Sequence, residues 1–82
     1  RGRLKKRQGR LKDAVADFTA ALRLNAMLPH VYAARARTRW EMGDSDGAFG
    51  DYAYSLEVSA PDWNRRDEVK EALRVLRHQR TA

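Results

Sequence analysis

Two stretches of the chain decide its fold: GRLKDAVADFTAALRLNA, residues 9–26, and GDSDGAFGDYAYSLEVSA, residues 43–60. They align at an offset of 34 residues, which pairs Gly9 with Gly43 at the start of each stretch. The same offset matches alanine at 14 and 48, aspartate at 17 and 51, an aromatic residue at 18 and 52, and leucine at 22 and 56. The chain therefore contains an internal repeat, which has to be interpreted before any individual residue.

The first stretch has the spacing of a helix with one apolar face. Its apolar residues occur at i, i+1, i+4, i+7 and i+8, namely Ala14, Val15, Phe18, Ala21 and Leu22. The spacing predicts a helix over residues 13–24. We expect Gly9 to end a preceding helix, because glycine tolerates the positive φ of a helix terminus.

The second stretch predicts a turn followed by a helix. The turn is expected at residues 43–46, with Asp44 or Ser45 capping the helix that follows and ends near Pro61. Its apolar face consists of Ala48, Phe49, Tyr52 and Leu56. Gly50 lies within this helix, where glycine is unfavourable, and so predicts close helix packing at that point.

Two further helices complete the expected elements. One runs from Pro29 to Met42, with proline in its first turn and Val31, Tyr32, Ala36 and Trp40 on one side. The last begins at Asp62 or Asn64, carries acidic residues early in the helix, and has an apolar stripe made of Val69, Ala72, Leu73 and Leu76.

The repeated pattern G-x4-A-x2-D-(F/Y)-x3-L, at a period of 34, resembles the tetratricopeptide repeat (TPR), a helix–turn–helix unit. The resemblance implies an all-α chain whose antiparallel helix pairs stack as a short TPR solenoid, with about two repeats plus a terminal helix. Residues 1–26 would form a first, N-terminally incomplete repeat and 27–61 the second, followed by a terminal or capping helix at 62–79 and a tail at 80–82. About three repeats are usually needed for stability. We therefore expect a partner or flanking sequence to cover at least one end, and the initial Arg1 suggests a chain cut from a longer one.

In TPR proteins the first helix of each unit lines a concave groove that holds an extended peptide or a helix of a partner. The resemblance places these residues in such a groove: Arg3, Lys6, Arg7, His30, Ala33, Arg37, Trp40, Glu41, Asn64, Asp67 and Glu71. Arg3 and Arg37 occupy equivalent positions one repeat apart, where arginine can hold a carboxylate with two hydrogen bonds. The alternatives are that the arginines form a solvated face and that Trp40 belongs mainly to the core. The carboxylate clamp of chaperone-binding TPRs is not expected, because Ala34, Asn64 and Glu68 lack its basic groups.

Composition argues for a binding module over an enzyme. The chain has 82 residues, 43% hydrophobic and 34% charged, which is enough for one small domain. It contains no cysteine, no G-x-S-x-G element, no phosphate-binding loop and only two distant histidines, so we expect no catalytic site, metal or cofactor. No apolar run approaches the ~20 residues of a membrane-spanning helix, and no signal-peptide pattern is present. An intracellular location is favoured without being fixed.

The net charge of +6 is distributed unevenly. Residues 1–12 contain seven basic and no acidic residues, whereas residues 43–61 contain four acidic and no basic ones. A protein-interaction scaffold within a larger assembly is the leading hypothesis, with self-association through exposed repeat ends as a variant of it. RNA or ribonucleoprotein binding through the basic N-terminal helix is the alternative, and it would be nonspecific because that segment lacks aromatic residues. A membrane-surface role is weaker, since Leu4 and Leu11 are the only large apolar residues there, and a regulatory segment of an enzyme also stays open.

Overall fold

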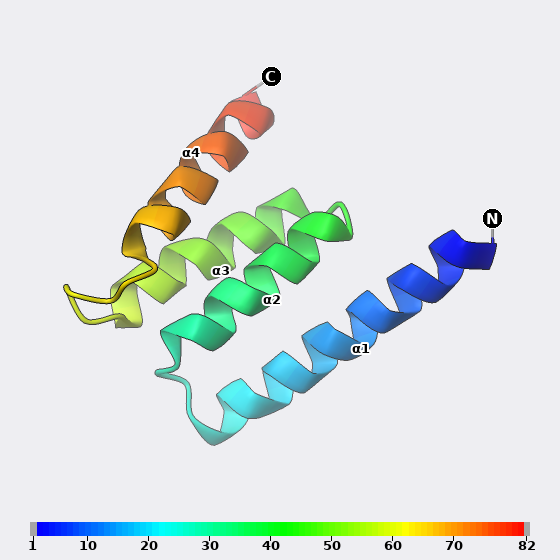
Figure 1. The fold of residues 1–82 in the computed structure, drawn as a ribbon, viewed down its shortest axis with the longest axis horizontal. Helices are drawn as coiled ribbons and strands as arrows, with labels where there is room; N and C mark the ends of the chain where they lie inside the picture. The colour runs from blue at the N-terminus through cyan, green and yellow to red at the C-terminus, as the bar shows by residue number, and fades with distance from the viewer. Residues whose placement is uncertain (1, 82) are drawn as a thin grey trace.

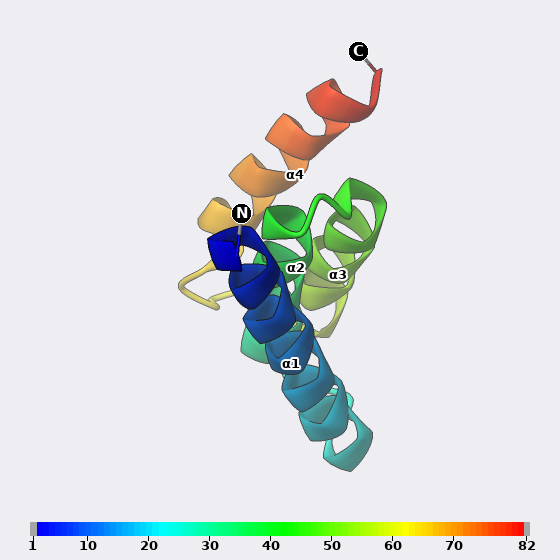
Figure 2. The ribbon, with the colours of Figure 1, turned by 90° about the vertical axis from the view of Figure 1, so that its right-hand side faces the viewer.

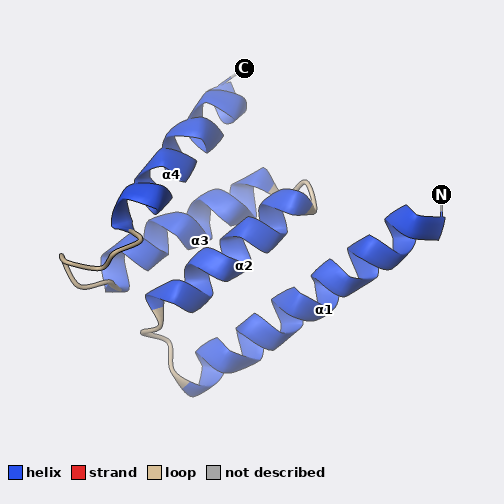
Figure 3. Ribbon diagram, in the orientation of Figure 1, coloured by secondary structure: helices blue, strands red, loops and turns tan. Residues whose placement is uncertain are grey.

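The computed structural model describes the backbone of residues 2–81 and the side chains of residues 9–79. It contains the helices α1 (Gly2–Leu24), α2 (Pro29–Glu41), α3 (Ser45–Val58) and α4 (Arg66–Thr81), as shown in Figure 1. The described part of the chain contains no strand (Figure 3). The expectation of an all-α chain is confirmed.

The helices form a single layer. Each packs against the next in chain order, α1 on α2, α2 on α3 and α3 on α4, and the chain reverses direction at each connection (Figure 1). The molecule measures 43 × 36 × 17 Å, and its narrow dimension is seen in the turned view of Figure 2. Among the described residues, no helix is both long and apolar enough to cross a membrane.

The turn between α2 and α3 contains the predicted cap at Asp44, but it ends earlier than predicted, because α3 begins at Ser45. Gly43 has a φ of 88°, which residues with a Cβ rarely adopt. The Asp44 carboxylate caps α3 by accepting a hydrogen bond from the Gly47 backbone N–H at 2.9 Å. A Cβ on Gly47 would clash with this carboxylate, so the cap as it stands leaves room only for glycine at position 47.

The expected turn at Gly9 is wrong, because α1 runs without interruption from Gly2 to Leu24. The residues that follow explain the difference between the two repeats. Arg10, Leu11 and Lys12 are strong helix formers and offer no side-chain cap, whereas Gly43 is followed by Asp-Ser-Asp. Equivalent glycines therefore lie in a helix in the first repeat and in a turn in the second.

Two smaller expectations are also corrected. Gly50 is exposed, and a Cβ added there would meet nothing within 4 Å, so it marks no close helix contact. The last helix begins at Arg66, later than the predicted Asp62 or Asn64. Trp63 causes the delay: its backbone N–H bonds to the Ala60 carbonyl, its carbonyl accepts from Arg66, and its ring packs against the core.

The core consists of two clusters on either side of the α2–α3 hairpin. The larger joins α2, α3 and α4, and its buried residues are Ala33, Ala36, Ala48, Tyr52, Val69 and Leu76. The smaller joins α1 to the hairpin through buried Leu22, Val31 and Tyr32. Ala36 and Ala48 are fully buried, and their small side chains let α2 and α3 approach closely.

A buried ion-pair network crosses three helices. The Asp51 carboxylate on α3 accepts two hydrogen bonds from Arg35 on α2, at 2.8 and 2.7 Å, and one from Arg39 at 3.0 Å. Arg35 also donates to the Thr19 hydroxyl of α1 at 3.2 Å. The hydrogen bonds to Asp51 raise the pKa of the Arg35 guanidinium, which keeps it charged. The network fixes the register of α1, α2 and α3.

Candidate functional site

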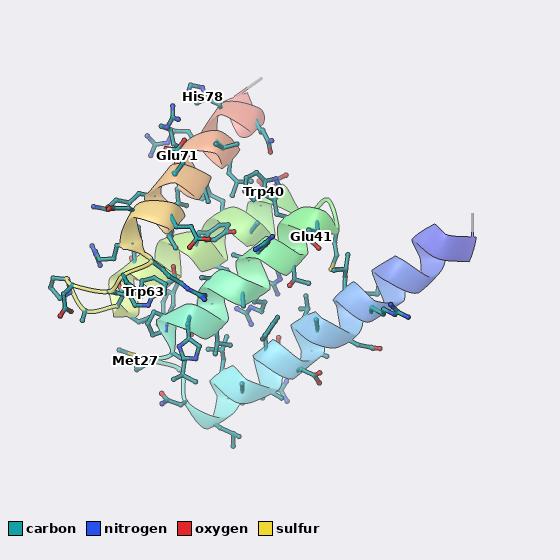
Figure 4. The ribbon with its side chains drawn as sticks, in the orientation of Figure 1. Met27, Trp40, Glu41, Trp63, Glu71 and His78 are labelled. Carbon is teal, nitrogen blue, oxygen red and sulfur yellow. The ribbon has the colours of Figure 1, made fainter. Side chains whose placement is uncertain are left out.

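A groove of about 510 Å³ lies between α2 and α4, on one face of the helix layer. Its lining residues recur at helical spacing on each side: Arg37, Trp40 and Glu41 from α2, and Glu68, Glu71, Ala72 and Val75 from α4, with Tyr52 of α3 between them. Figure 4 labels Trp40 and Glu41 on α2 and Glu71 on α4. Because α2 and α4 both pack against α3 more than against each other, α3 forms the base of the groove.

Two aromatic side chains line the groove. The rings of Trp40 and Tyr52 meet edge to face, with centroids 6.4 Å apart and planes at 87°. The Trp40 indole N–H donates to the Gln79 side-chain oxygen at 3.3 Å, which ties the ring to the end of α4. Trp40 therefore packs partly against the larger core cluster and also lines the groove.

The charged residues of the groove are three glutamates and one arginine. Arg37 lies 3.8 Å from the Glu41 carboxylate, and its side chain is 75% exposed. Burial raises the pKa of the Tyr52 phenol, an effect that Arg37 opposes and Glu68 and Glu41 reinforce. Charged residues on both walls of the groove therefore change the pKa of the Tyr52 hydroxyl.

Glu71 is held by a second arginine outside the groove lining. Arg74, one turn further along α4, donates two hydrogen bonds to the Glu71 carboxylate. These hydrogen bonds lower the pKa of Glu71, so the carboxylate is ionised at neutral pH. Both side chains of the pair are exposed, so solvent screens their interaction and the pair contributes little to folding.

A smaller hollow of about 170 Å³ continues the groove toward the beginning of α4. It shares Arg37, Tyr52 and Glu68 with the larger groove and adds Arg65, together with Ala33 and Ala34. Two arginines and one glutamate line this hollow. The charge of the continuous surface therefore changes from basic near Arg65 to acidic near Glu41 and Glu71.

The structure brings together four of the eleven residues proposed from sequence for the groove: Arg37, Trp40, Glu41 and Glu71 line the larger groove. A fifth, Ala33, lines the smaller hollow. His30, Asn64 and Asp67 are exposed and line neither hollow. The side chains of Arg3, Lys6 and Arg7 lie outside the described residues.

Four lining residues were not proposed from sequence as part of a site: Tyr52, Glu68, Ala72 and Val75. Glu68, Glu71, Ala72 and Val75 follow the i, i+3, i+4, i+7 spacing of one helix face, so extending the helical face from Glu71 would have found the other three. Tyr52 was assigned to the apolar face of its helix, and its ring is buried. No sequence pattern indicates that its edge borders the groove.

Among the described residues, no group of three or more histidine, aspartate or glutamate side chains is placed to hold a metal ion. The groove offers aromatic surface and fixed charges of both signs. Its geometry suits noncovalent binding of an extended segment that carries apolar and charged side chains.

Comparison of the chain with protein-family models, with curated proteins and with solved structures gave no match.

Proposed function

We propose that the chain is a TPR-like interaction module that binds an extended peptide or a helix of a partner protein in the groove between α2 and α4. The observation that carries the proposal is the groove itself, which is lined by the half-buried Trp40 and the edge of the buried Tyr52 and has charged residues on both walls. Aromatic side chains at the centre of a concave surface are the usual anchors of protein interfaces.

The repeat supports the same proposal. The 34-residue register and the antiparallel α2–α3 hairpin are compatible with a TPR-like module, in which α2 and α4 would be the first helices of successive units.

Selection of peptides from a random display library, followed by affinity measurement, tests the proposal. Selected peptides should lose roughly tenfold or more in affinity for Trp40→Ala, because Trp40 is an aromatic residue that lines the groove and is only partly buried. Trp63→Ala is the matched control, since Trp63 packs against the same core cluster but does not line the groove. Equal affinity for the two variants, or no peptide selected, would contradict groove binding.

The alternative of RNA binding through residues 1–12 rests on their seven basic residues. Neutralising several phosphates would release counterions and make the affinity fall steeply with salt. Titration of a single-stranded RNA at two salt concentrations tests this alternative, because phosphate binding should weaken at the higher salt concentration. The Trp40→Ala variant separates it from groove binding, because this substitution should leave the RNA affinity unchanged.

A further inference from the structure

α1 repeats a set of residues that α3 buries. On α3 these residues are Ala48, Asp51 and Ser55, each at most 6% exposed. At the offset of 34 residues they correspond to the following residues of α1: Ala14, Asp17 and Ala21. On α1 the aspartate is exposed and both alanines are only half-buried. A similar surface therefore occurs twice in the chain, covered on α3 and uncovered on α1.

The position of α1 in the helix layer explains this difference. α3 packs against both α2 and α4, whereas α1 packs mainly against α2 and lies at the edge of the layer (Figure 1). Phe18 and Leu22 take part in the apolar contact with α2, and the Thr19 hydroxyl accepts a hydrogen bond from Arg35. No other described helix covers the face of α1 that contains Asp17.

This face of α1 has an apolar residue as well as a carboxylate. Leu24 lies seven residues after Asp17, about two turns further along the same side of the helix, and is 91% exposed. A leucine exposed to this extent gains free energy when a partner removes it from water. We call the residues spaced i, i+3, i+7 and i+10 on this side the open face of α1: Ala14, Asp17, Ala21 and Leu24.

The aspartate of the open face lacks the partners that its counterpart on α3 has. The Asp51 carboxylate accepts hydrogen bonds from Arg35 at 2.8 and 2.7 Å and from Arg39 at 3.0 Å. Asp17 has no hydrogen-bond or ion-pair partner among the described side chains. A helix that approached α1 as α2 approaches α3 could place its own arginines beside this carboxylate.

The packing of α2 on α3 defines the helix that would fit. Arg35 and Arg39 lie four residues apart on α2, and Ala36 next to the first of them is fully buried. The small alanine lets the two helices approach closely, and planar guanidiniums match a carboxylate better than ammonium groups do. In the same antiparallel arrangement, the C-terminal end of the added helix would lie toward Arg10, whose positive charge suits that end of the helix dipole.

We propose that the open face of α1 binds a helix of a partner protein that carries two arginines four residues apart, the first followed directly by alanine. Asp17 accepts hydrogen bonds from both guanidiniums, as Asp51 does from those of α2. A second copy of the chain would have to unpack its own α2 to supply this helix, because Ala33 and Ala36 are already buried in its core. The site lies apart from the groove between α2 and α4 and does not depend on groove binding.

NMR of the isotope-labelled chain with an unlabelled peptide tests the proposal. The peptide has the sequence of residues 28–42, so it presents the arginine pair of α2 to a site that α2 does not occupy. We expect it to shift the backbone amide signals of Asp17 and Leu24. The indole N–H signal of Trp40, which reports on the groove, should not shift.

Variants of the peptide test the role of the arginine pair. The peptide variant Arg35→Gln should bind about tenfold more weakly, because it loses hydrogen bonds to a charged group. Arg37→Gln is the matched control, since it removes the same charge from a side chain that is 75% exposed on α2 and lies beside Glu41. This control peptide should bind like the original.

Variants of the chain test the role of the carboxylate. Asp17→Asn should weaken binding of the original peptide by about tenfold. Asp62→Asn is the matched control, because it removes the same charge from an exposed residue in the turn before α4. Circular dichroism verifies that both variants are folded.

Four results would overturn the proposal. The first is equal binding of the Arg35→Gln and Arg37→Gln peptides, and the second is equal binding by the Asp17→Asn and Asp62→Asn chains. The third is a peptide that shifts the Trp40 indole signal in place of the α1 signals, which would place it in the groove and support groove binding alone. The fourth is a set of α1 signals that shift with protein concentration in the absence of peptide, which would show that a second copy covers the open face.

Discussion

Replacing Asp51 with alanine should be among the most damaging single changes to this fold. Its carboxylate accepts two hydrogen bonds from Arg35 and one from Arg39, and its side chain is 8% exposed. The substitution leaves two guanidiniums, 15% and 29% exposed, beside a carboxylate-sized gap. Removing one member of a buried ion pair costs about 3–5 kcal/mol.

Two corrections bring the expected loss to the lower end of that range. Alanine favours a helix interior over aspartate by about 0.5 kcal/mol, and the partial exposure of Arg39 lets water replace part of its interaction. We therefore expect the free energy of unfolding to fall by about 3 kcal/mol. For a chain of this size that corresponds to a decrease in Tm of about 12–24 °C.

Urea unfolding followed by circular dichroism at 222 nm measures the loss. Asp62→Ala is the control, because Asp62 is exposed in the turn before α4 and should change the unfolding free energy by less than about 0.5 kcal/mol. A double-mutant cycle with Arg35→Ala should give a coupling energy of about 2 kcal/mol. A loss below about 0.5 kcal/mol for Asp51→Ala would refute the argument that this network holds the helices in register.

Three other changes have defined outcomes. Gly43→Ala should destabilise the fold by about 1–2 kcal/mol, because residue 43 has a positive φ. Gly9→Ala should stabilise the fold by up to about 1 kcal/mol, because residue 9 lies inside α1 and a Cβ there meets no other atom. Urea unfolding measures both changes, and changes of the same sign would contradict this prediction. Leu76→Ala, at a fully buried position of α4, should cost about 2–5 kcal/mol in the same assay. Arg74→Ala should raise the pKa of Glu71 toward its ordinary value, as followed by carboxyl NMR. Since the pKa of Glu71 is lowered in the folded chain, the ion pair stabilises the fold above the ordinary carboxyl pKa, and this stabilisation is lost as the pH falls through the lowered pKa. A Glu71 pKa that is unchanged by Arg74→Ala would contradict the pairing.

The sequence predicted the helices well where local signals agreed. Around Gly43, glycine, a capping aspartate and the loss of apolar periodicity all indicate the same turn, and the turn forms. At Gly9 the repeat register alone suggested a turn, and the helix propensity of the following residues outweighs it. Repeat similarity therefore predicted the turn only where a capping residue follows the glycine.

The ion-pair network and the groove were harder to predict for a different reason. Asp51 was noticed as a repeated residue, but its partners lie 16 and 12 positions away, and no short-range pattern identifies them. The groove combines three helices, and Tyr52 enters it from a helix assigned to the core. Both features depend on how the helices stack, which periodicity within one helix does not specify.

The division of the core into two clusters gives the molecule two cooperative units of unequal strength. Among its described side chains α1 buries only Leu22, whereas α2, α3 and α4 share the larger cluster. Detachment of α1 should therefore require less free energy than global unfolding, and the amide protons of α1 should exchange with solvent first. A ligand held between α2 and α4 would slow exchange throughout the three-helix unit while leaving the opening of α1 almost unchanged.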